Sequence, residues 1–306
     1  LIEGLRTDDH RRSFDLPPVP NYFFQRDPQV VMGDRVLISS MATRAREREP
    51  LLASLLFDHH PELAGPDEPI RLRPDLGEIR DDGRACPCPR LEGGDVLVPS
   101  PGILLVGISQ RTSRLGVETL TERLRDAGCQ FHHLILVELP ARRAYMHLDT
   151  VFTLIDRDCC LAYLPVVAGG GPESAMVYRV ELDGSQLSHV RCPPLLETLA
   201  ELGLDLEVVP CGGGDDLIHQ EREQWTDGAN AFAIAPGVIL LYRRNRRSAA
   251  ALAARGWRVL SERQALAGDE PLVGAGRTVI TFAGHELSRA RGGPRCMTMP
   301  LERDTT

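Results

Sequence analysis

The chain contains no lysine, so all 35 of its basic residues are arginine. It has no run of 18 or more apolar residues, and we therefore expect no membrane span. No charged-then-apolar leader stands at its start, so no signal peptide is expected either. The net charge of −8 disfavours a general nucleic-acid binder. The rest of the composition, 42% hydrophobic and 25% charged residues, is that of an ordinary globular chain.

The eight cysteines are few for 306 residues and irregularly spaced. Cys86 and Cys88 form one close pair, and Cys159 and Cys160 another, but neither has a second pair or a histidine cluster at zinc-finger spacing. We expect no structural metal and a reduced, cytoplasmic environment. The stretches "AGGGP" and "CGGGDD" lack the G-x-G-x-x-G fingerprint, and no cofactor is expected.

Short β-like runs recur along the chain, separated by turn signals. They cover residues 35–40, 102–109, 131–139, 150–156, 159–167, 175–182, 206–210, 237–244 and 277–284. Helical patterns cover residues 46–63, 113–128, 193–204 and 245–256, with Ser113 and Asn245 as the expected N-caps of two of them. The order strand, strand, helix, strand recurs in residues 95–139, 150–209 and 231–260. This ββαβ order favours a modular α/β architecture over a doubly wound sheet.

Charged residues interrupt the apolar strand patterns at several places. In "MHLDT", an extended chain would direct His147 and Asp149 to the same face. In "LEGGD", Glu92 and Asp95 flank two glycines that allow a close backbone approach. Taken alone, "MHLDT" is more typical of a half-solvated strand and "LEGGD" of a turn than of a functional site, so the motifs indicate a function only together.

Cys296 follows a Gly-Gly-Pro turn between arginines, in "RARGGPRCMTMP", and not an apolar run. A cysteine and a histidine together suggest covalent catalysis. The carboxylates of the other motifs suggest a cationic substrate, because a planar guanidinium binds paired carboxylates through bidentate hydrogen bonds. The pattern therefore indicates a thiol-dependent enzyme for a guanidino compound.

Seven motifs in this order resemble the bacterial arginine deiminases of the guanidino-group-modifying (pentein) superfamily, from about residue 16 to the end of the chain. The motifs are "PNYFFQRDP", "TRAREREP", "LEGGDVLV", "GISQRTS", "MHLDTVFTLID", "REQWTDGANAFAIAPGVILLYRRN" and "RGGPRCMTMPLERD". The resemblance implies an α/β pentein propeller of ββαβ modules around a pseudo-fivefold axis, as one catalytic domain over residues 1–306. It also implies hydrolysis of L-arginine to L-citrulline and ammonia.

The resemblance assigns a role to each residue that matches the family's motifs. Cys296 is the expected nucleophile and His147 the expected general acid and base. Glu92 is expected to hold the guanidinium and assist proton transfer. Asp27 and Asp149 are expected to grip the guanidinium nitrogens.

Further matching residues are implied to surround the rest of the substrate. Asp95 matches a supporting carboxylate and is grouped with the substrate-binding residues. Asn21 and Phe24 match a polar contact and an aromatic wall. The arginines expected to bind the substrate carboxylate are Arg44, Arg111 and Arg291, with Arg295 as the alternative to Arg291.

The chain departs from the family at its start, where the "PNYFFQRDP" motif begins as early as Pro20. We therefore expect an N-terminal module to be missing. Two alternative functions stay open: a related guanidino hydrolase or amidinotransferase with another substrate, and a catalytically impaired arginine-binding fragment. Residues 222–236 are interpreted as scaffold, in which Trp225 packs and Asp227 begins a turn. A homo-oligomer is also an open alternative.

Overall fold

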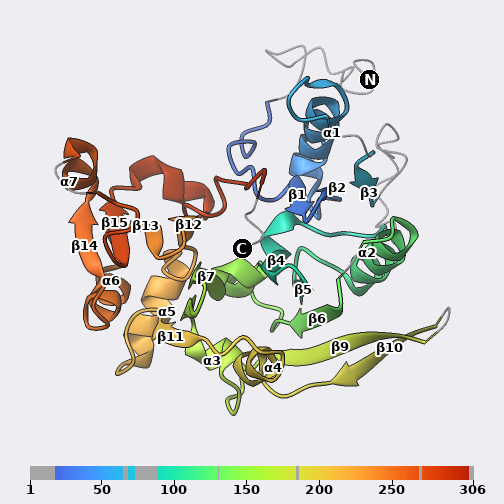
Figure 1. Cartoon of the computed structure of the whole chain (residues 1–306). Coiled ribbons are helices and arrows are strands. Elements are labelled where there is room, and N and C mark those ends of the chain that lie inside the picture. Colours follow the sequence, from blue (N-terminus) through green and yellow to red (C-terminus); the bar gives the residue numbers. More distant parts are fainter. Residues whose placement is uncertain are drawn as a thin grey trace. The chain divides into compact units, whose positions relative to one another are not determined.

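The computed structural model describes residues 18–64, 68–72, 88–129, 131–183, 186–268 and 271–302, and Cys86 lies outside them. Internal contacts divide the chain into two compact units (Figure 1). The first unit comprises residues 1–93, 111–130 and 299–306, and the second comprises residues 94–110 and 131–298.

The first unit contains a small mixed sheet in the order β1-β2-β3. Its elements are β1 (Gln29–Met32), β2 (Arg35–Ile38), the 3-10 helix η2 (Arg44–Arg46), α1 (Glu49–His59) and β3 (Ile70–Arg71). Strand β1 is antiparallel to β2, and β3 is parallel to it. Helix α1 begins three residues later than the sequence pattern predicts, with Pro50 in its first turn, where the missing N–H costs nothing. This gives a further ββαβ order that the sequence pattern did not reveal.

Helix α2 (Arg114–Asp126), also in the first unit, follows the sequence prediction closely. The side chain of Ser113 accepts a hydrogen bond from the backbone N–H of Gly116, as expected for an N-cap. The chain leaves the helix at Gly128, whose φ of 66° is a left-handed conformation that favours glycine.

The second unit contains a five-stranded sheet in the order β10-β9-β6-β5-β4. Its strands are β4 (Val96–Ser100), β5 (Ile103–Ile108), β6 (His133–Glu138), β9 (Met176–Asp183) and β10 (Gln186–Arg191). Strands β5 and β6 are parallel, and the other pairs are antiparallel. The β9–β10 hairpin extends from this sheet as a long arm (Figure 1), and strand β10 was not predicted.

A second sheet of this unit has the order β11-β8-β7. Its elements are β7 (Phe152–Asp156), β8 (Cys159–Ala162), α3 (Leu164–Val167), α4 (Leu195–Glu201) and β11 (Glu207–Pro210). The predicted strand over residues 159–167 is too long, because residues 164–167 form helix α3. Pro165 stands in the first turn of that helix and has no N–H for a strand ladder.

The last sheet of the unit has the order β12-β13-β15-β14. Its elements are α5 (Leu217–Trp225), β12 (Phe232–Ala235), β13 (Val238–Tyr242), α6 (Arg246–Ala253), β14 (Arg258–Ser261), α7 (Glu262–Ala267) and β15 (Thr278–Phe282). Asn245 is the N-cap residue of α6, as predicted, but its side chain makes no capping hydrogen bond. The carboxylate of Glu223 accepts the backbone N–H groups of Arg247 and Ser248 instead, so α5 caps α6.

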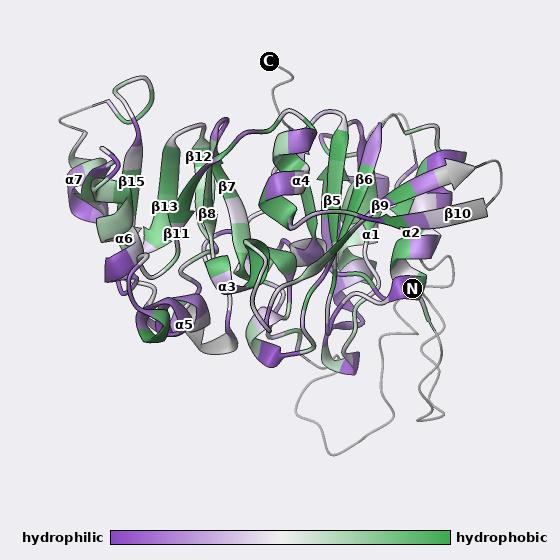
Figure 2. Cartoon of the chain, turned by 90° about the horizontal axis from the view of Figure 1, so that it is seen from below, coloured by the Kyte–Doolittle hydropathy of each residue, from purple (hydrophilic) through white to green (hydrophobic). Residues whose placement is uncertain are grey.

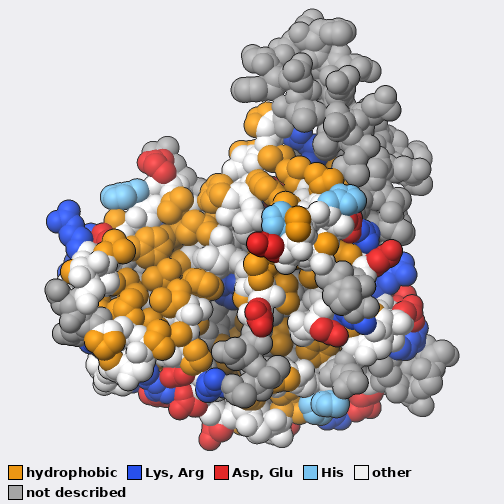
Figure 3. Space-filling view, turned by 45° about the horizontal axis from the view of Figure 1, so that its top comes forward, with side chains coloured by type: hydrophobic (Ala, Val, Ile, Leu, Met, Phe, Trp, Pro, Cys, Tyr) orange, Lys and Arg blue, Asp and Glu red, His pale blue; other side chains and the backbone are white. Residues whose placement is uncertain are grey.

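Apolar strands form the cores of the sheets, as the hydrophobic colouring of β13 and its neighbours shows (Figure 2). Apolar side chains also gather on part of the face seen in Figure 3. The most exposed large apolar residues of the second unit include Ile218 and Leu266. Exposed apolar area of this kind is typical of contact surfaces. Within the described residues, no helix is both long and apolar enough to cross a membrane.

Candidate active site

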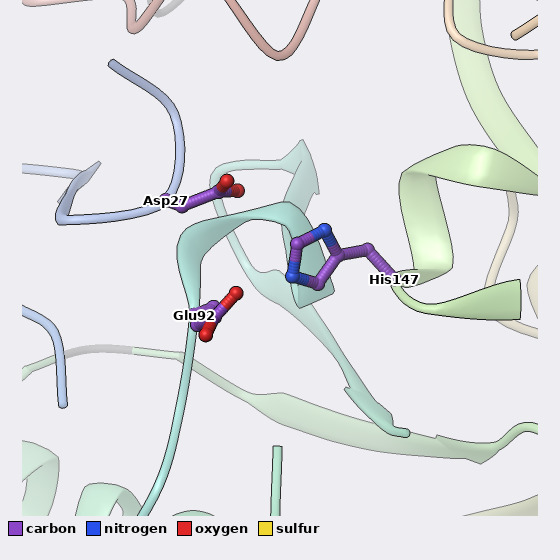
Figure 4. A group of neighbouring side chains, drawn as sticks. All are labelled: Asp27, Glu92 and His147. Atoms are coloured by element: carbon purple, nitrogen blue, oxygen red, sulfur yellow. The ribbon is translucent and has the colours of Figure 1, made fainter. Parts of the chain in front are cut away.

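Two buried carboxylates of the first unit, Asp27 and Glu92, come from the segments that precede β1 and the 3-10 helix η3 (Gly93–Asp95) (Figure 4). The guanidinium of Arg46 contacts both. Its Nη1 donates to Asp27 Oδ2 at 2.6 Å and lies 3.9 Å from Glu92 Oε2. The two carboxylates predicted to hold a substrate guanidinium thus already surround a guanidinium of the protein.

Arg46 and its neighbour Glu49 are site residues that the sequence interpretation missed. The Nε of Arg46 donates to Glu49 Oε1 at 3.0 Å and its Nη2 donates to Glu49 Oε2 at 2.7 Å, a bidentate pair in a buried position. Burial lowers the pKa of Arg46, but the charges of Asp27, Glu49 and Glu92 outweigh it, so the net direction is upward. Both residues stand in the quoted motif "TRAREREP", which was the available signal.

The predicted arginines of the first unit differ in their surroundings. Arg111 Nη1 lies 3.4 Å from Glu92 Oε1, and the same oxygen accepts the backbone N–H of Ala42 at 2.9 Å. Arg44 is exposed on η2. Glu92 therefore receives donors from several sides.

Asn21 and Phe24 stand in the segment before β1. Asn21 is half-buried, and its carbonyl oxygen accepts the backbone N–H of Phe24 at 2.9 Å. Phe24 is buried, and its ring centre lies 4.1 Å from that of the exposed Phe23. Two adjacent aromatic rings therefore stand at the position where the sequence predicts an aromatic wall.

In the second unit, the side chains of His147 and Asp149 are both buried. The alternative interpretation of "MHLDT" as a strand with one face in solvent is therefore excluded. His147 is extended, with φ −140° and ψ 157°, but residues Leu148–Thr150 form the 3-10 helix η5 (Figure 4). The prediction that the two side chains share one face of a strand is therefore wrong. The turn starts because the carbonyl of His147 accepts both the N–H and the hydroxyl of Thr150.

Gly94 and Asp95 hold this segment from one side. A Cβ atom at Gly94 would lie 2.6 Å from Cγ and Nδ1 of His147, so the predicted close approach is confirmed and the approached group is the imidazole. Asp95 Oδ1 accepts the N–H of Leu148 at 2.8 Å, and Oδ2 accepts the hydroxyl of Ser109 at 2.7 Å. Asp95 thus binds the backbone next to His147 and Asp149, which suits a supporting carboxylate.

The loop that carries Cys296 is tied to Asp149. Cys296 is 5% exposed, and its backbone N–H donates to Asn230 Oδ1 at 3.2 Å. Arg295 Nη1 donates to Asp149 Oδ2 at 2.6 Å. The other carboxylate oxygen, Asp149 Oδ1, is buried and has no hydrogen-bond partner among the described residues. One oxygen of Asp149 is therefore engaged by the protein and the other remains as an acceptor.

Arg291, five residues before the cysteine, has a different environment from Arg295. Its guanidinium lies over the ring of Trp225, with Cζ 3.9 Å from the ring centre. Its Nε and Nη1 are buried and lack hydrogen-bond partners within the described part of the chain. Burial lowers the pKa of Arg291. The expectation that Trp225 packs into the scaffold is wrong, because its side chain is 49% exposed and presents a face to Arg291.

Asp227 lies beside this group on a turn, as predicted, with a left-handed φ of 64°. Its side chain is buried, and burial raises its pKa to about 7 although the charges of Arg291 and Arg244 oppose the shift. The segment that was interpreted as plain scaffold therefore carries a titratable group next to a candidate substrate-binding arginine.

The family model described as "Arginine deiminase" matches residues 3–303. The chain belongs to the arginine deiminase family. The arginine deiminase of Bacillus cytotoxicus is 37% identical over 298 residues, which cover 97% of this chain and 65% of that protein. The arginine deiminase of Latilactobacillus sakei is 36% identical over 309 residues, covering 100% of this chain and 67% of that protein. The chain thus spans about two thirds of the length of these family members.

Similar solved structures show the same α/β fold at low sequence identity. DDAH from Pseudomonas aeruginosa, in a complex with citrulline, has a TM-score of 0.53 at 15% identity and covers 92% of this chain and 76% of that one. The N-terminal domain of ArgZ, a cyanobacterial arginine dihydrolase, has a TM-score of 0.58 at 14% identity and covers 94% and 79%. The predicted family is confirmed, and the mixed sheets with their helices agree with the predicted α/β fold class.

Proposed function

We propose that the chain acts as an arginine deiminase, which hydrolyses L-arginine to L-citrulline and ammonia through a covalent intermediate on Cys296. One observation carries the proposal beyond family membership. Asp149 keeps a buried oxygen, Oδ1, without a hydrogen-bond partner among the described residues, while Arg295 holds the other oxygen. A buried acceptor of this kind calls for a donor from a ligand, and a guanidinium supplies planar N–H groups.

In the proposed complex, Asp149, Asp27 and Glu92 hold the substrate guanidinium. Asp27 and Glu92 belong to the first unit and Asp149 to the second, so their action on one substrate is part of the proposal. The contacts of Arg46 with Asp27 and Glu92 support it, because they are contacts of these same carboxylates with a guanidinium.

The amino-acid end of the substrate needs its own partners. We assign its carboxylate to Arg44, Arg111 and Arg291, and we prefer Arg291 over Arg295. Arg291 has donors without a partner among the described residues, whereas Arg295 is bound to Asp149. Asn21 and Phe24 are assigned to the substrate's remaining contacts.

The chemistry takes two steps. The thiolate of Cys296 attacks the guanidinium carbon, His147 protonates one terminal nitrogen, and the carbon–nitrogen bond breaks to release ammonia. The resulting thiouronium is attacked by a water molecule that gives a proton to His147. The carbon–sulfur bond then breaks, which releases citrulline and restores the thiolate. Asp95 supports the segment of His147 by its hydrogen bond to Leu148.

The finer architecture is also proposed. We infer that the ββαβ units are modules of a pentein propeller around a pseudo-fivefold axis, forming one catalytic domain. The recurring orders β1-β2-α1-β3, β4-β5-α2-β6, β7-β8-α4-β11 and β12-β13-α6-β14 support this. A cytoplasmic location and a homo-oligomer stay predictions from the sequence.

The test is a colorimetric citrulline assay on the purified chain with L-arginine. Cys296→Ala should abolish turnover, and Cys192→Ala, at a half-buried cysteine of the same unit, should not. Mass spectrometry of quenched wild-type protein should show the thiouronium on Cys296. A chelator should leave the rate unchanged, because no metal enters the proposed steps.

Three outcomes would contradict the proposal. Turnover that survives Cys296→Ala excludes the covalent mechanism. Binding of arginine without citrulline favours an arginine-binding fragment. Faster turnover of agmatine or dimethylarginine than of arginine assigns the site to another guanidino substrate, since agmatine lacks the carboxylate that the arginines would bind.

A further inference from the structure

Asn230 lies between the two chain segments that carry Asp149 and Cys296. Its side chain is fully buried in the second unit. The amide Nδ2 donates to the backbone carbonyl of Asp149 at 3.1 Å, and Oδ1 accepts the backbone N–H of Cys296 at 3.2 Å. Asp149 stands 81 residues before Asn230 and Cys296 stands 66 residues after it. One side chain therefore links two distant segments of the chain.

The backbone of the loop that carries Cys296 is in close contact with Asn230 at Gly293. A Cβ atom at Gly293 would lie 2.4 Å from Asn230 Oδ1 and 2.7 Å from its Cβ, so only glycine fits there. The preceding carbonyl, that of Gly292, accepts the hydroxyl of Tyr242 at 2.8 Å. The two glycines thus press the loop against Asn230 and Tyr242, which fixes its position.

The other side of the link is equally constrained. The amide of Gln224 donates to the carbonyls of Ala144 at 2.8 Å and Thr150 at 3.1 Å, on both sides of His147. The end of α5 and the loop after it thus hold the His147 segment through Gln224 and the Cys296 segment through Asn230.

We propose that Asn230 is a positioning residue that sets the Cys296 thiol relative to Asp149 and His147. An amide is required, because one partner is a carbonyl that needs a donor and the other an N–H that needs an acceptor. Aspartate in its place would direct a carboxylate oxygen at the carbonyl of Asp149. Because catalysis depends on near-attack geometry, a small displacement of the thiol lowers the rate of the chemical step. The expected effect of Asn230 on turnover rests on the proposed function, whereas its effect on the position of the Cys296 loop does not.

The test compares Asn230→Asp with a matched control, Asn245→Asp. Asn245 is also fully buried in the second unit, with Nδ2 donating to the carbonyl of Thr226 at 3.1 Å and Oδ1 accepting its hydroxyl at 2.7 Å. Both changes remove one buried amide donor and lower the Tm. Only Asn230→Asp should reduce kcat for L-arginine, by about 100-fold, with KM changed less than about threefold.

A second readout needs no turnover. Release of the loop should raise the rate at which iodoacetamide alkylates Cys296, measured by mass spectrometry of its peptide, by about tenfold or more. Asn245→Asp should leave that rate unchanged. If the wild-type chain fails to convert arginine, the proposed function fails, but the alkylation rates still test the role of Asn230.

Gly293→Ala gives an independent variant should Asn230→Asp not fold. It keeps the amide and displaces it, and it should reproduce both the loss of kcat and the faster alkylation. The proposal is wrong if Asn230→Asp retains wild-type kcat and alkylation rate. It is also wrong if the Asn230 and Asn245 variants lose activity equally, because Asn230 would then act on stability alone.

Discussion

The guanidinium carbon of Arg291 lies 3.9 Å from the centre of the Trp225 ring, and two of the guanidinium nitrogens have no hydrogen-bond partner among the described residues. The indole thus fixes the direction of an arginine while leaving its donors for a ligand. Trp225 is half-exposed, so its removal leaves the core intact.

Trp225→Ala should raise KM for L-arginine about fivefold or more, since a stacked cation–π contact contributes about 1 kcal/mol or more. The kcat should change little, because Arg291 is assigned in the proposal to the carboxylate of the substrate and not to the reacting guanidinium. KM for agmatine should not change, since agmatine has no carboxylate for Arg291. Ile218→Ala, an exposed position on the same helix α5, is the control. Equal losses for arginine and agmatine would contradict this assignment.

Arg295→Ala should destabilise the second unit. It leaves the buried carboxylate of Asp149 without its 2.6 Å partner, and loss of one member of such a pair costs about 3 kcal/mol or more. The measurement is the free energy of unfolding by urea. Arg179→Ala serves as the comparison, because its 2.6 Å pair with Glu181 is exposed on the β9 strand. Exposed pairs contribute little, and a similar effect of both changes would be inconsistent with a special role for Arg295.

Arg46→Ala should destabilise the first unit by about 3–5 kcal/mol, because it leaves Asp27, Glu49 and Glu92 as buried carboxylates without their shared cation. Burial already raises the pKa of Glu49 in the presence of Arg46. The loss of unfolding free energy caused by Arg46→Ala should therefore become smaller as pH falls and the carboxylates become protonated. Arg48→Ala is the control, and urea unfolding at two pH values is the measurement. A loss that grows at low pH would refute the explanation.

Asp227 should make stability fall as pH rises. Its pKa in the folded protein, about 7, is above its ordinary value of 3.8, so the folded state binds more protons between these values. Stability is then lost from about pH 4 to pH 7, by at most about 1.4 kcal/mol per pH unit. Asp227→Asn should remove this slope from a Tm series, whereas Asp205→Asn, at an exposed aspartate, should retain it. An unchanged slope in Asp227→Asn would show that the carboxyl does not titrate there.

Local sequence patterns predicted local structure well. The Ser113 cap and the Gly128 stop of α2 depend on residues within one helix, and both are observed. The N-cap position of α6 at Asn245 was also predicted, but the hydrogen bonds that cap this helix come from Glu223, 24 residues before Arg247, and were missed. Strand β10 of the β9–β10 arm was missed although its pairing with β9 is local. Its residues 188–191 are all exposed, so they lack the alternation of apolar and polar positions that marks a half-buried strand.

In the candidate active site, too, features that are visible in a short stretch of sequence were predicted, and long-range contacts were not. Motif matching proposed the residues with reactive groups, such as Cys296 and His147, because their chemistry is visible in the sequence. It did not reveal Arg46, since an arginine in a charged motif is ordinarily a surface residue. It also did not reveal Asn230, because the two groups that its amide links lie 81 residues before it and 66 after it.

The segments of the candidate active site are held largely by their backbone. Asp95 binds the N–H of Leu148, Gln224 binds the carbonyl of Thr150, and Asn230 binds the carbonyl of Asp149 and the N–H of Cys296. Main-chain contacts persist when the side chain at the contacted position changes. The reactive side chains can therefore be exchanged without dismantling their support, so inactive variants at Cys296 should remain well-formed receptors in which a bound substrate can be trapped and seen.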